Sequence, residues 1–148
     1  MKLLRYITFG MMLLLCLTST QCEDDDCCGP DPVSCEKQVV IDDEIYGQES
    51  PALAVISAAT IEGDCLIISF GASGCDGASW VYDVVFSTAV AESLPVQRAA
   101  RFNLVNEEDC DAFLTQETSF DLSVFQQFNE NPILINLEGW DGELLYKF

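Results

Sequence analysis

Apolar and polar residues alternate along most of the chain beyond residue 36, and this period of two constrains the fold more than any other feature. The clearest case is the segment Ser79 to Thr88. One face of that segment carries Trp80, Tyr82, Val84 and Phe86, and the other carries Val81, Asp83, Val85 and Ser87. Successive side chains of a strand point to opposite faces, so this pattern predicts a half-buried β-strand.

Similar patterns, or short runs of β-branched and aromatic residues, predict further strands. These lie at 38–41, 53–61, 65–70, 96–105, 112–122, 133–137 and 143–148. The Asp141-Gly142 pair between the last two segments is a strong hairpin signal. Seven or eight short strands separated by turns predict an all-β fold, an antiparallel β-sandwich that is Ig-like or small and barrel-like.

The connections between these strands carry weaker signals. Gly71, Gly74 and Gly77 indicate a loop after residue 70. Residues 89–95 favour a helical turn that ends at a proline, and residues 123–131 favour a brief helix or a loop. No segment predicts a helix of three turns.

The N-terminus has the organisation of an export signal. Lys2 and Arg5 precede an apolar stretch at 7–17, which is too short for a comfortable transmembrane helix. A polar stretch follows and leads to Cys22. This pattern predicts a signal peptide at residues 1–21.

A cysteine directly after such a segment resembles the lipobox of bacterial lipoproteins, and the acidic run at 23–26 resembles the tether of surface-exported members. The resemblance implies acylation of Cys22 (palmitate among the acyl chains) and an outer membrane lipoprotein at the cell surface or facing the periplasm. Ordinary secretion with cleavage near Gln21 is the alternative. The chain resembles small uncharacterised bacterial lipoproteins, which implies no defined activity.

Residues 22–36 are rich in acids, Cys and Pro, and cannot bury much apolar surface. We therefore expect a tether at 22–36 and one β-sandwich domain at 37–148. Removal of residues 1–21 would leave 4 cations against 25 acids, a net charge of −21.

The chain has eight cysteines, and an exported protein holds them in an oxidising compartment. Six follow Cys22, which allows 15 pairings. We favour Cys75 with Cys110 and Cys65 with Cys35 as structural disulfides. The alternative is a metal or redox site, for which the sequence offers no Cys-x-x-Cys pair.

Composition excludes several classes of function. The absence of His rules out Ser-His-Asp and Cys-His catalysis and His-containing zinc sites. The chain carries 25 acidic and 6 basic residues, a net charge of −19. This balance argues against a nucleic-acid partner, because neutralising phosphates needs clustered Lys and Arg.

Two aromatic segments are candidate binding sites. Asp76, in the glycine-flanked sequence before Trp80, could line a binding surface, although we favour a packing role for Trp80 because it shares the face of the core residues. Trp140 at the hairpin tip is equally compatible with an exposed contact for sugar or protein and with packing over the sheet.

Acidic clusters at 42–44 and at 107–111 raise the question of Ca²⁺, which prefers oxygen ligands. Neither cluster matches the Asp-x-Asp-x-Asp-Gly calcium loop, and we favour a solvated surface. Arg98 and Arg101 fall on opposite strand faces, so we expect them to pair with local acids and to form no joint anion site.

These observations predict a lipid-anchored cell-envelope protein that is not an enzyme and needs no cofactor. We expect a binding or accessory module, attached to the membrane through its lipid, for protein or carbohydrate. The alternatives are a structural envelope protein without a small ligand and, less favoured, a small hydrolase that uses carboxylates alone.

Overall fold

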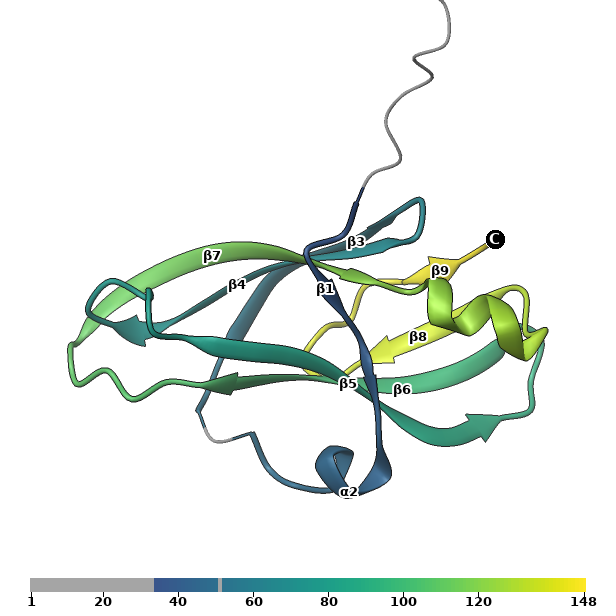
Figure 1. The fold of residues 1–148 in the computed structure, drawn as a ribbon, viewed down its shortest axis with the longest axis horizontal. Coiled ribbons are helices and arrows are strands. Elements are labelled where there is room, and N and C mark those ends of the chain that lie inside the picture. Colours follow the sequence, from purple (N-terminus) through teal and green to yellow (C-terminus); the bar gives the residue numbers. More distant parts are fainter. Residues whose placement is uncertain (1–33, 51) are drawn as a thin grey trace, which may run out of the picture. The chain divides into compact units, whose positions relative to one another are not determined.

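The computed structural model describes residues 34–50 and 52–148, which form two facing β-sheets (Figure 1). The four-stranded sheet has the order β1 (Lys37–Gln38), β7 (Ala112–Asp121), β4 (Cys65–Gly74) and β3 (Val55–Glu62). The five-stranded sheet has the order β2 (Val40–Ile41), β5 (Val81–Ala91), β6 (Val96–Val105), β8 (Ile133–Leu137) and β9 (Leu145–Tyr146). Two short helices, α2 (Asp43–Tyr46) and the 3₁₀ helix η1 (Ser123–Phe128), complete the described part.

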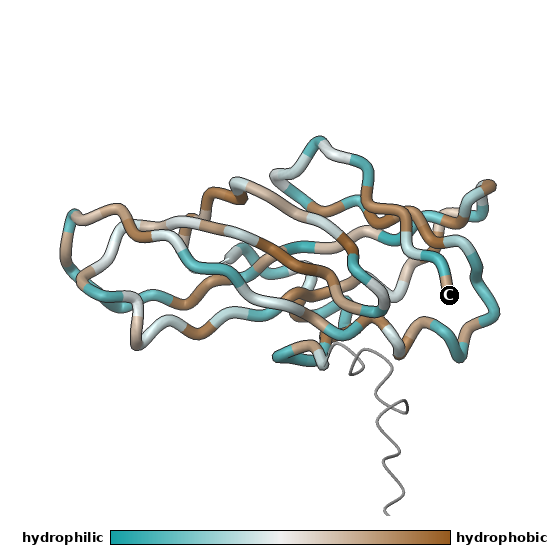
Figure 2. The backbone as a smooth tube through the Cα atoms, turned by 90° about the horizontal axis from the view of Figure 1, so that it is seen from above, coloured by the Kyte–Doolittle hydropathy of each residue, from teal (hydrophilic) through white to brown (hydrophobic). Residues whose placement is uncertain are grey.

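The core lies between the two sheets and is built from the inward-facing residues of the alternating strands. Phe70 of β4 and Phe102 of β6 meet across it with ring centroids 4.5 Å apart. Trp80 is 6% exposed and its ring lies 6.0 Å from that of Phe70. Full burial of one such side chain contributes about 1.5–3 kcal/mol. Apolar segments of several strands are visible along the backbone in Figure 2.

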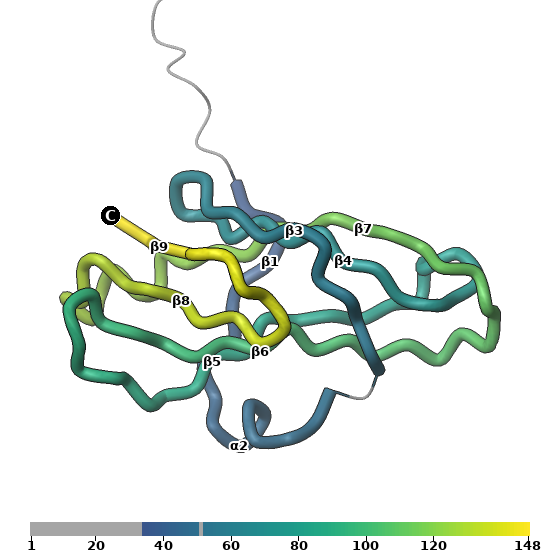
Figure 3. Tube along the Cα trace, turned by 180° about the vertical axis from the view of Figure 1, so that it is seen from behind, coloured from purple at the N-terminus to yellow at the C-terminus, as the bar shows by residue number. Residues whose placement is uncertain are grey.

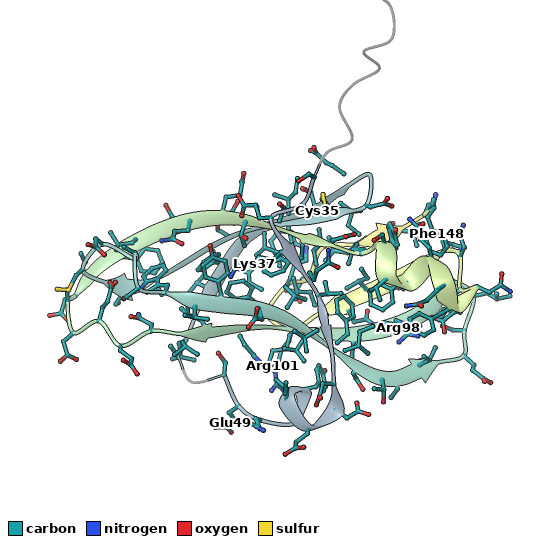
Figure 4. The ribbon with its side chains drawn as sticks, viewed as in Figure 1. Cys35, Lys37, Glu49, Arg98, Arg101 and Phe148 are labelled. Atoms are coloured by element: carbon teal, nitrogen blue, oxygen red, sulfur yellow. A yellow bond between two sulfur atoms is a disulfide. The ribbon has the colours of Figure 1, made fainter. Side chains whose placement is uncertain are left out.

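Near its N-terminus the domain crosses from one sheet to the other within five residues. β1 pairs in parallel with β7, and β2 pairs in parallel with β5. The Lys37 ammonium donates a hydrogen bond to the Tyr82 carbonyl oxygen (2.8 Å) and lies 3.9 Å from the centroid of the Tyr82 ring. The segment therefore closes one side of the sandwich and ties the two sheets together (Figure 4).

Both predicted disulfides are present. Cys35–Cys65 joins the residues before β1 to the buried start of β4, and Cys75–Cys110 joins the β4–β5 loop to the β6–β7 loop. Glu36, which the sequence assigns to the tether, donates its backbone N–H to the Ser119 hydroxyl. The predicted signal peptide, Cys22 and the tether as far as residue 33 lie outside the described residues. Neither described helix is long and apolar enough to cross a membrane.

The prediction of an all-β sandwich is confirmed, but its strands are not all antiparallel. β3–β4, β4–β7, β5–β6 and the β8–β9 hairpin are antiparallel, whereas β1–β7, β2–β5 and β6–β8 are parallel. Alternation gives the faces of a strand but says nothing about the direction of its neighbour. Each parallel pair joins strands separated by a long stretch of chain, as parallel pairing requires.

Two predicted connections are wrong. β4 continues through Gly71 to Gly74, because these residues pair with β7 from Thr115 to Ala112. The Phe113 ring covers Gly71 so closely that a Cβ there would lie 2.5 Å from it. The helical turn predicted at 89–95 does not form. Instead β5 continues to Ala91 after a register shift between Phe86 and Val90. The last strand is also shorter than predicted, since β9 comprises only Leu145–Tyr146.

Arg98 is a charged residue whose side chain is buried in the folded domain. It lies on the inward face of β6 and is 4% exposed. Its Nε donates to a Glu130 carboxylate oxygen at 2.8 Å and its Nη2 to the other at 3.0 Å. The guanidinium also lies 5.1 and 5.2 Å from the ring centroids of Phe125 and Phe128. Arg98 thus fixes η1 against the five-stranded sheet (Figure 4).

We expect Arg98→Ala to lower the free energy of unfolding by about 3–5 kcal/mol, because it leaves the partly buried Glu130 carboxylate without its partner. Arg101→Ala is the matched control on the opposite face of β6. Its ion pair with Glu138 is more exposed, so the loss of unfolding free energy should be clearly smaller than for Arg98→Ala. Urea unfolding followed by circular dichroism measures both. Equal losses would contradict the assignment of Arg98 to the core.

Candidate functional site

The outer face of the five-stranded sheet carries a groove of about 540 Å³. Tyr46 of α2 lies on its margin, and Asn136 of β8 and Trp140 of the β8–β9 loop also line it. The acidic residues of the groove are Glu138, Asp141 and Glu143. Two aromatic side chains beside carboxylates and an amide offer both an apolar ring surface and hydrogen-bonding groups.

Trp140 combines the two arrangements that the sequence left open. The residue is half-buried and packs against the core, yet it also lines the groove. Gly142 lies so close to the indole that a Cβ there would be 2.5 Å from Nε1. The Nε1 atom is buried without a hydrogen-bond partner among the described residues. Trp140 therefore presents part of its ring, and not its N–H group, to the groove.

Arg101 holds one side of the groove in place. Its Nε donates to the Glu138 carboxylate at 2.7 Å, and its guanidinium carbon lies 5.0 Å from the centroid of the Tyr46 ring. A second guanidinium nitrogen donates to the Gln48 carbonyl oxygen. Arg101 thereby ties α2 and the following residues to the β8–β9 loop. Figure 4 shows it beside α2.

α2 positions Tyr46, and its start explains one acidic cluster. The Asp42 carboxylate accepts a hydrogen bond from the Ile45 N–H and caps the helix. The Asp43 carboxylate accepts hydrogen bonds from the Thr88 hydroxyl, the Ser87 hydroxyl and the Thr88 backbone N–H, and these bonds lower the pKa of Asp43. The 42–44 cluster therefore anchors α2 to β5.

The second acidic cluster also has a structural partner. The Glu108 carboxylate accepts hydrogen bonds from the Ser79 hydroxyl at 2.7 Å and from the backbone N–H groups of Cys75, Gly77 and Asp76 at 2.6, 3.1 and 3.2 Å. Consecutive N–H groups that converge on one anion form a nest. These hydrogen bonds lower the pKa of Glu108 to about 2. The bond from Ser79 has the largest effect, and the three backbone bonds add to it.

Asp76, the other predicted binding residue, has a local role in the structure. Its carboxylate accepts a hydrogen bond from the Ala78 N–H at 2.9 Å, the geometry of an Asx turn. Asp76 does not line the groove that contains Trp140. Gly77, at φ 71°, adopts the left-handed conformation that the loop requires. The structure therefore assigns the 74–80 loop and Trp140 to different sites.

Within the described residues, no group of three or more acidic or cysteine side chains is placed to hold a metal ion. The carboxylates of Asp42, Asp43 and Glu108 are instead used by backbone and hydroxyl donors. Ca²⁺ binding, the less favoured alternative at both clusters, stays an untested hypothesis.

Sequence reasoning missed Tyr46 and the role of Glu108. A signal for α2 was present, because Asp42 followed by Asp43 and Glu44 is a typical helix start with acids in the first turn. The contact between Glu108 and the 75–79 loop had no such signal. It joins residues 29 to 33 positions apart, which only the folded sheets bring together.

No family model matches the chain, and no curated protein matches it. Among solved structures, it is similar to a Bacteroides vulgatus protein of unknown function, DUF1344. The TM-score is 0.51 and the sequence identity 12%, over 76% of this chain and 56% of that one. The chain thus spans little more than half the length of that neighbour, and the likeness concerns the fold alone.

The Glu108 contact predicts an acid-dependent loss of stability. A carboxylate whose pKa is lowered on folding stabilises the protein above its ordinary pKa of 4.5, and this contribution disappears as the pH falls towards about 2. We expect Glu108→Gln to lower the Tm by a few degrees at pH 7. The difference between variant and wild type should shrink between pH 4.5 and 2.

Thermal unfolding across this pH range measures both effects, and Glu107→Gln is the control, since Glu107 is the exposed neighbouring acid. If Glu107→Gln and Glu108→Gln had the same Tm profile, the hydrogen bonds to the 75–79 loop would not stabilise the fold.

Proposed function

We propose that the protein is a non-catalytic binding module, lipid-anchored in the bacterial cell envelope, and that its groove binds a neutral carbohydrate. The observation that carries this proposal is the pairing of Tyr46 and Trp140 with acidic and amide side chains in one groove. Sugar rings stack on aromatic faces, and their hydroxyl groups donate hydrogen bonds to carboxylates.

The charge of the groove narrows the class of ligand. Of its acidic residues, Glu138 is paired with Arg101, and Asp141 and Glu143 are exposed. The whole chain has a net charge of −19. An anionic ligand would be repelled at this surface, so sulfated and uronic-acid glycans are poor candidates. Neutral oligosaccharides fit the groove better.

The lipid anchor is supported by the sequence before the described residues. The cationic start, the apolar stretch at 7–17 and Cys22 form the lipoprotein signal, and the acidic run at 23–26 fits a surface-exported tether. The two disulfides are compatible with an oxidising compartment outside the cytoplasm.

A hydrolase is a weaker hypothesis. General acid catalysis by a carboxyl group needs a raised pKa, whereas hydrogen bonds lower the pKa of Asp43, Glu108 and Asp121. None of the three lines the groove. The other alternative is a structural envelope protein without a ligand, and a binding experiment distinguishes it from the binding module.

Affinity electrophoresis in gels that contain xylan, β-glucan or mannan tests the groove, with heparin as the anionic probe. We expect retardation by a neutral polysaccharide and none by heparin. Trp140→Ala should weaken binding about tenfold through the lost ring contact, and Trp140→Phe should retain most of it.

Trp140 also packs on the core, so its substitution can affect folding as well as binding. Asn136 and Glu143 are exposed residues of the groove, and Asn136→Ala and Glu143→Ala therefore test binding independently. Glu107→Ala is the control outside the groove. Absence of retardation by any neutral polysaccharide would favour the structural role. Equal retardation of all variants would place polysaccharide binding outside the groove and contradict the assignment of the site.

The anchor is tested by the intact mass of the protein from the native membrane fraction. We expect a chain that begins at Cys22 and carries added acyl mass. Alkylation of thiols before and after reduction should show that the four cysteines of the two disulfides become reactive only after reduction. An unmodified chain in the soluble fraction would contradict the anchor and leave ordinary secretion.

A further inference from the structure

A second and smaller cavity adjoins the groove. Its lining residues come from the start of β3, from β6 and from the β8–β9 loop: Ala54, Ile56, Arg101, Phe102, Glu138 and Gly139. Glu138 lines both cavities, so a ligand in the groove can extend past this side chain into the smaller one. Figure 3 shows β3 and the yellow β8–β9 loop on the near side of the domain.

The smaller cavity forms because β6 is longer than its neighbour β8. Their pairing ends at Ala100, whose carbonyl oxygen accepts a hydrogen bond from the Glu138 N–H at 2.9 Å. The chain then turns away through Gly139, whose φ of 79° lies in the left-handed region that favours glycine. In the described part of the chain, no strand pairs with Arg101 and Phe102 on that side, and the cavity occupies this place.

One wall of the smaller cavity is apolar. Ala54 and Ile56 are half-buried and pack on the core, and Phe102 is buried. The cavity has a volume of about 170 Å³, against about 540 Å³ for the groove. Its size suits a substituent of a sugar ring that is itself held in the groove. An apolar substituent gains free energy there because it leaves water for an apolar surface.

Arg101 and Glu138 form the polar wall of the same cavity. The Arg101 Nε donates to one Glu138 carboxylate oxygen, and its Nη1 donates to the Gln48 carbonyl oxygen. Within the described residues, the Nη2 group of Arg101 and the second Glu138 oxygen have no hydrogen-bond partner. The pair therefore retains a donor and an acceptor for a ligand.

We propose that the groove selects N-acetylated hexosamines and that the acetamido group of one sugar occupies the smaller cavity. This inference rests on the proposed binding of neutral carbohydrate by the groove. The acetamido N–H donates to the second Glu138 oxygen, and its carbonyl oxygen accepts a hydrogen bond from Arg101. Its methyl group packs against Ile56 and Phe102. The cavity thus offers a partner to the donor, the acceptor and the methyl group of this substituent.

Other common substituents of sugars match the cavity less well. A hydroxyl group can bond to Arg101 or Glu138 but leaves the apolar wall uncovered. An O-acetyl ester has the carbonyl oxygen and the methyl group but no N–H donor for Glu138. A sialic acid carries an acetamido group, but its carboxylate is repelled by a chain with a net charge of −19. These comparisons favour the acetamido group of a neutral sugar.

Isothermal titration calorimetry with chitopentaose and cellopentaose tests the inference on the full exported chain, with Cys22→Ser to prevent acylation. The two pentasaccharides share a β-1,4-linked backbone and differ in the group at carbon 2, which is acetamido in one and hydroxyl in the other. We expect chitopentaose to bind at least about tenfold more tightly, because only its substituent satisfies both walls of the smaller cavity.

Ala54→Leu tests the place of the acetamido group, because the larger side chain fills part of the smaller cavity. We expect its affinity for chitopentaose to fall to that for cellopentaose. Its affinity for cellopentaose should stay unchanged, which shows that the groove is intact. Ala58→Leu is the matched control, since Ala58 is an exposed residue of β3 outside both cavities, and it should retain the preference.

The outcomes separate this inference from the proposed function. Equal affinities of the unsubstituted groove for the two pentasaccharides, or a preference that Ala54→Leu leaves intact, would overturn the acetamido site and leave carbohydrate binding in place. Retardation by xylan or mannan without binding of either pentasaccharide would do the same. Absence of binding to every neutral glycan would overturn the proposed function and this inference with it.

Discussion

The crossing of residues 35–41 between the two sheets is the constraint on which the rest of this fold depends. β1 and β2 are two residues long and would not hold a sheet edge by themselves. The Cys35–Cys65 disulfide fixes one end of the segment to the buried start of β4, and Lys37 reaches Tyr82 of the opposite sheet. Closing a loop of 30 residues stabilises the fold by about 3–4 kcal/mol in the chain-entropy model.

An acidic chain of this size must place its carboxylates where they do not oppose folding. Several are held by fixed donors: Asp42 and Asp43 by the start of α2 and the β5 hydroxyls, and Glu108 by the nest at 75–77. Glu130 is held by Arg98. Through these contacts the negatively charged side chains connect loops and helices to the sheets. The acids that remain exposed then determine which ligands the surface accepts.

Strand positions were largely predictable from the sequence because one face of each long strand is buried. Residues 96–105 match β6, and 112–122 match β7 within one residue. The parallel pairings were not predictable, because the hydrophobic period is the same for either direction. Gly71 shows a second limit, since it lies inside β4 through its pairing with Thr115 of β7, under the ring of Phe113. Both failures concern contacts that local pattern does not encode.

The candidate groove is also built by contacts between residues far apart in the sequence. For this reason the sequence predicted Trp140 on one side of the groove but not Tyr46 on the other. Trp140 stood out because it lies at the predicted hairpin tip, where an aromatic ring can either contact a ligand or pack over the sheet. Tyr46 belongs to the groove only in the folded protein, where Arg101 contacts both the Tyr46 ring of α2 and the Glu138 carboxylate. Arg101 was predicted to pair with a local acid, but Glu138 is 37 residues away. A binding surface assembled by one such side chain is a property of the packed sheets, and a single sequence supplies its parts without their arrangement.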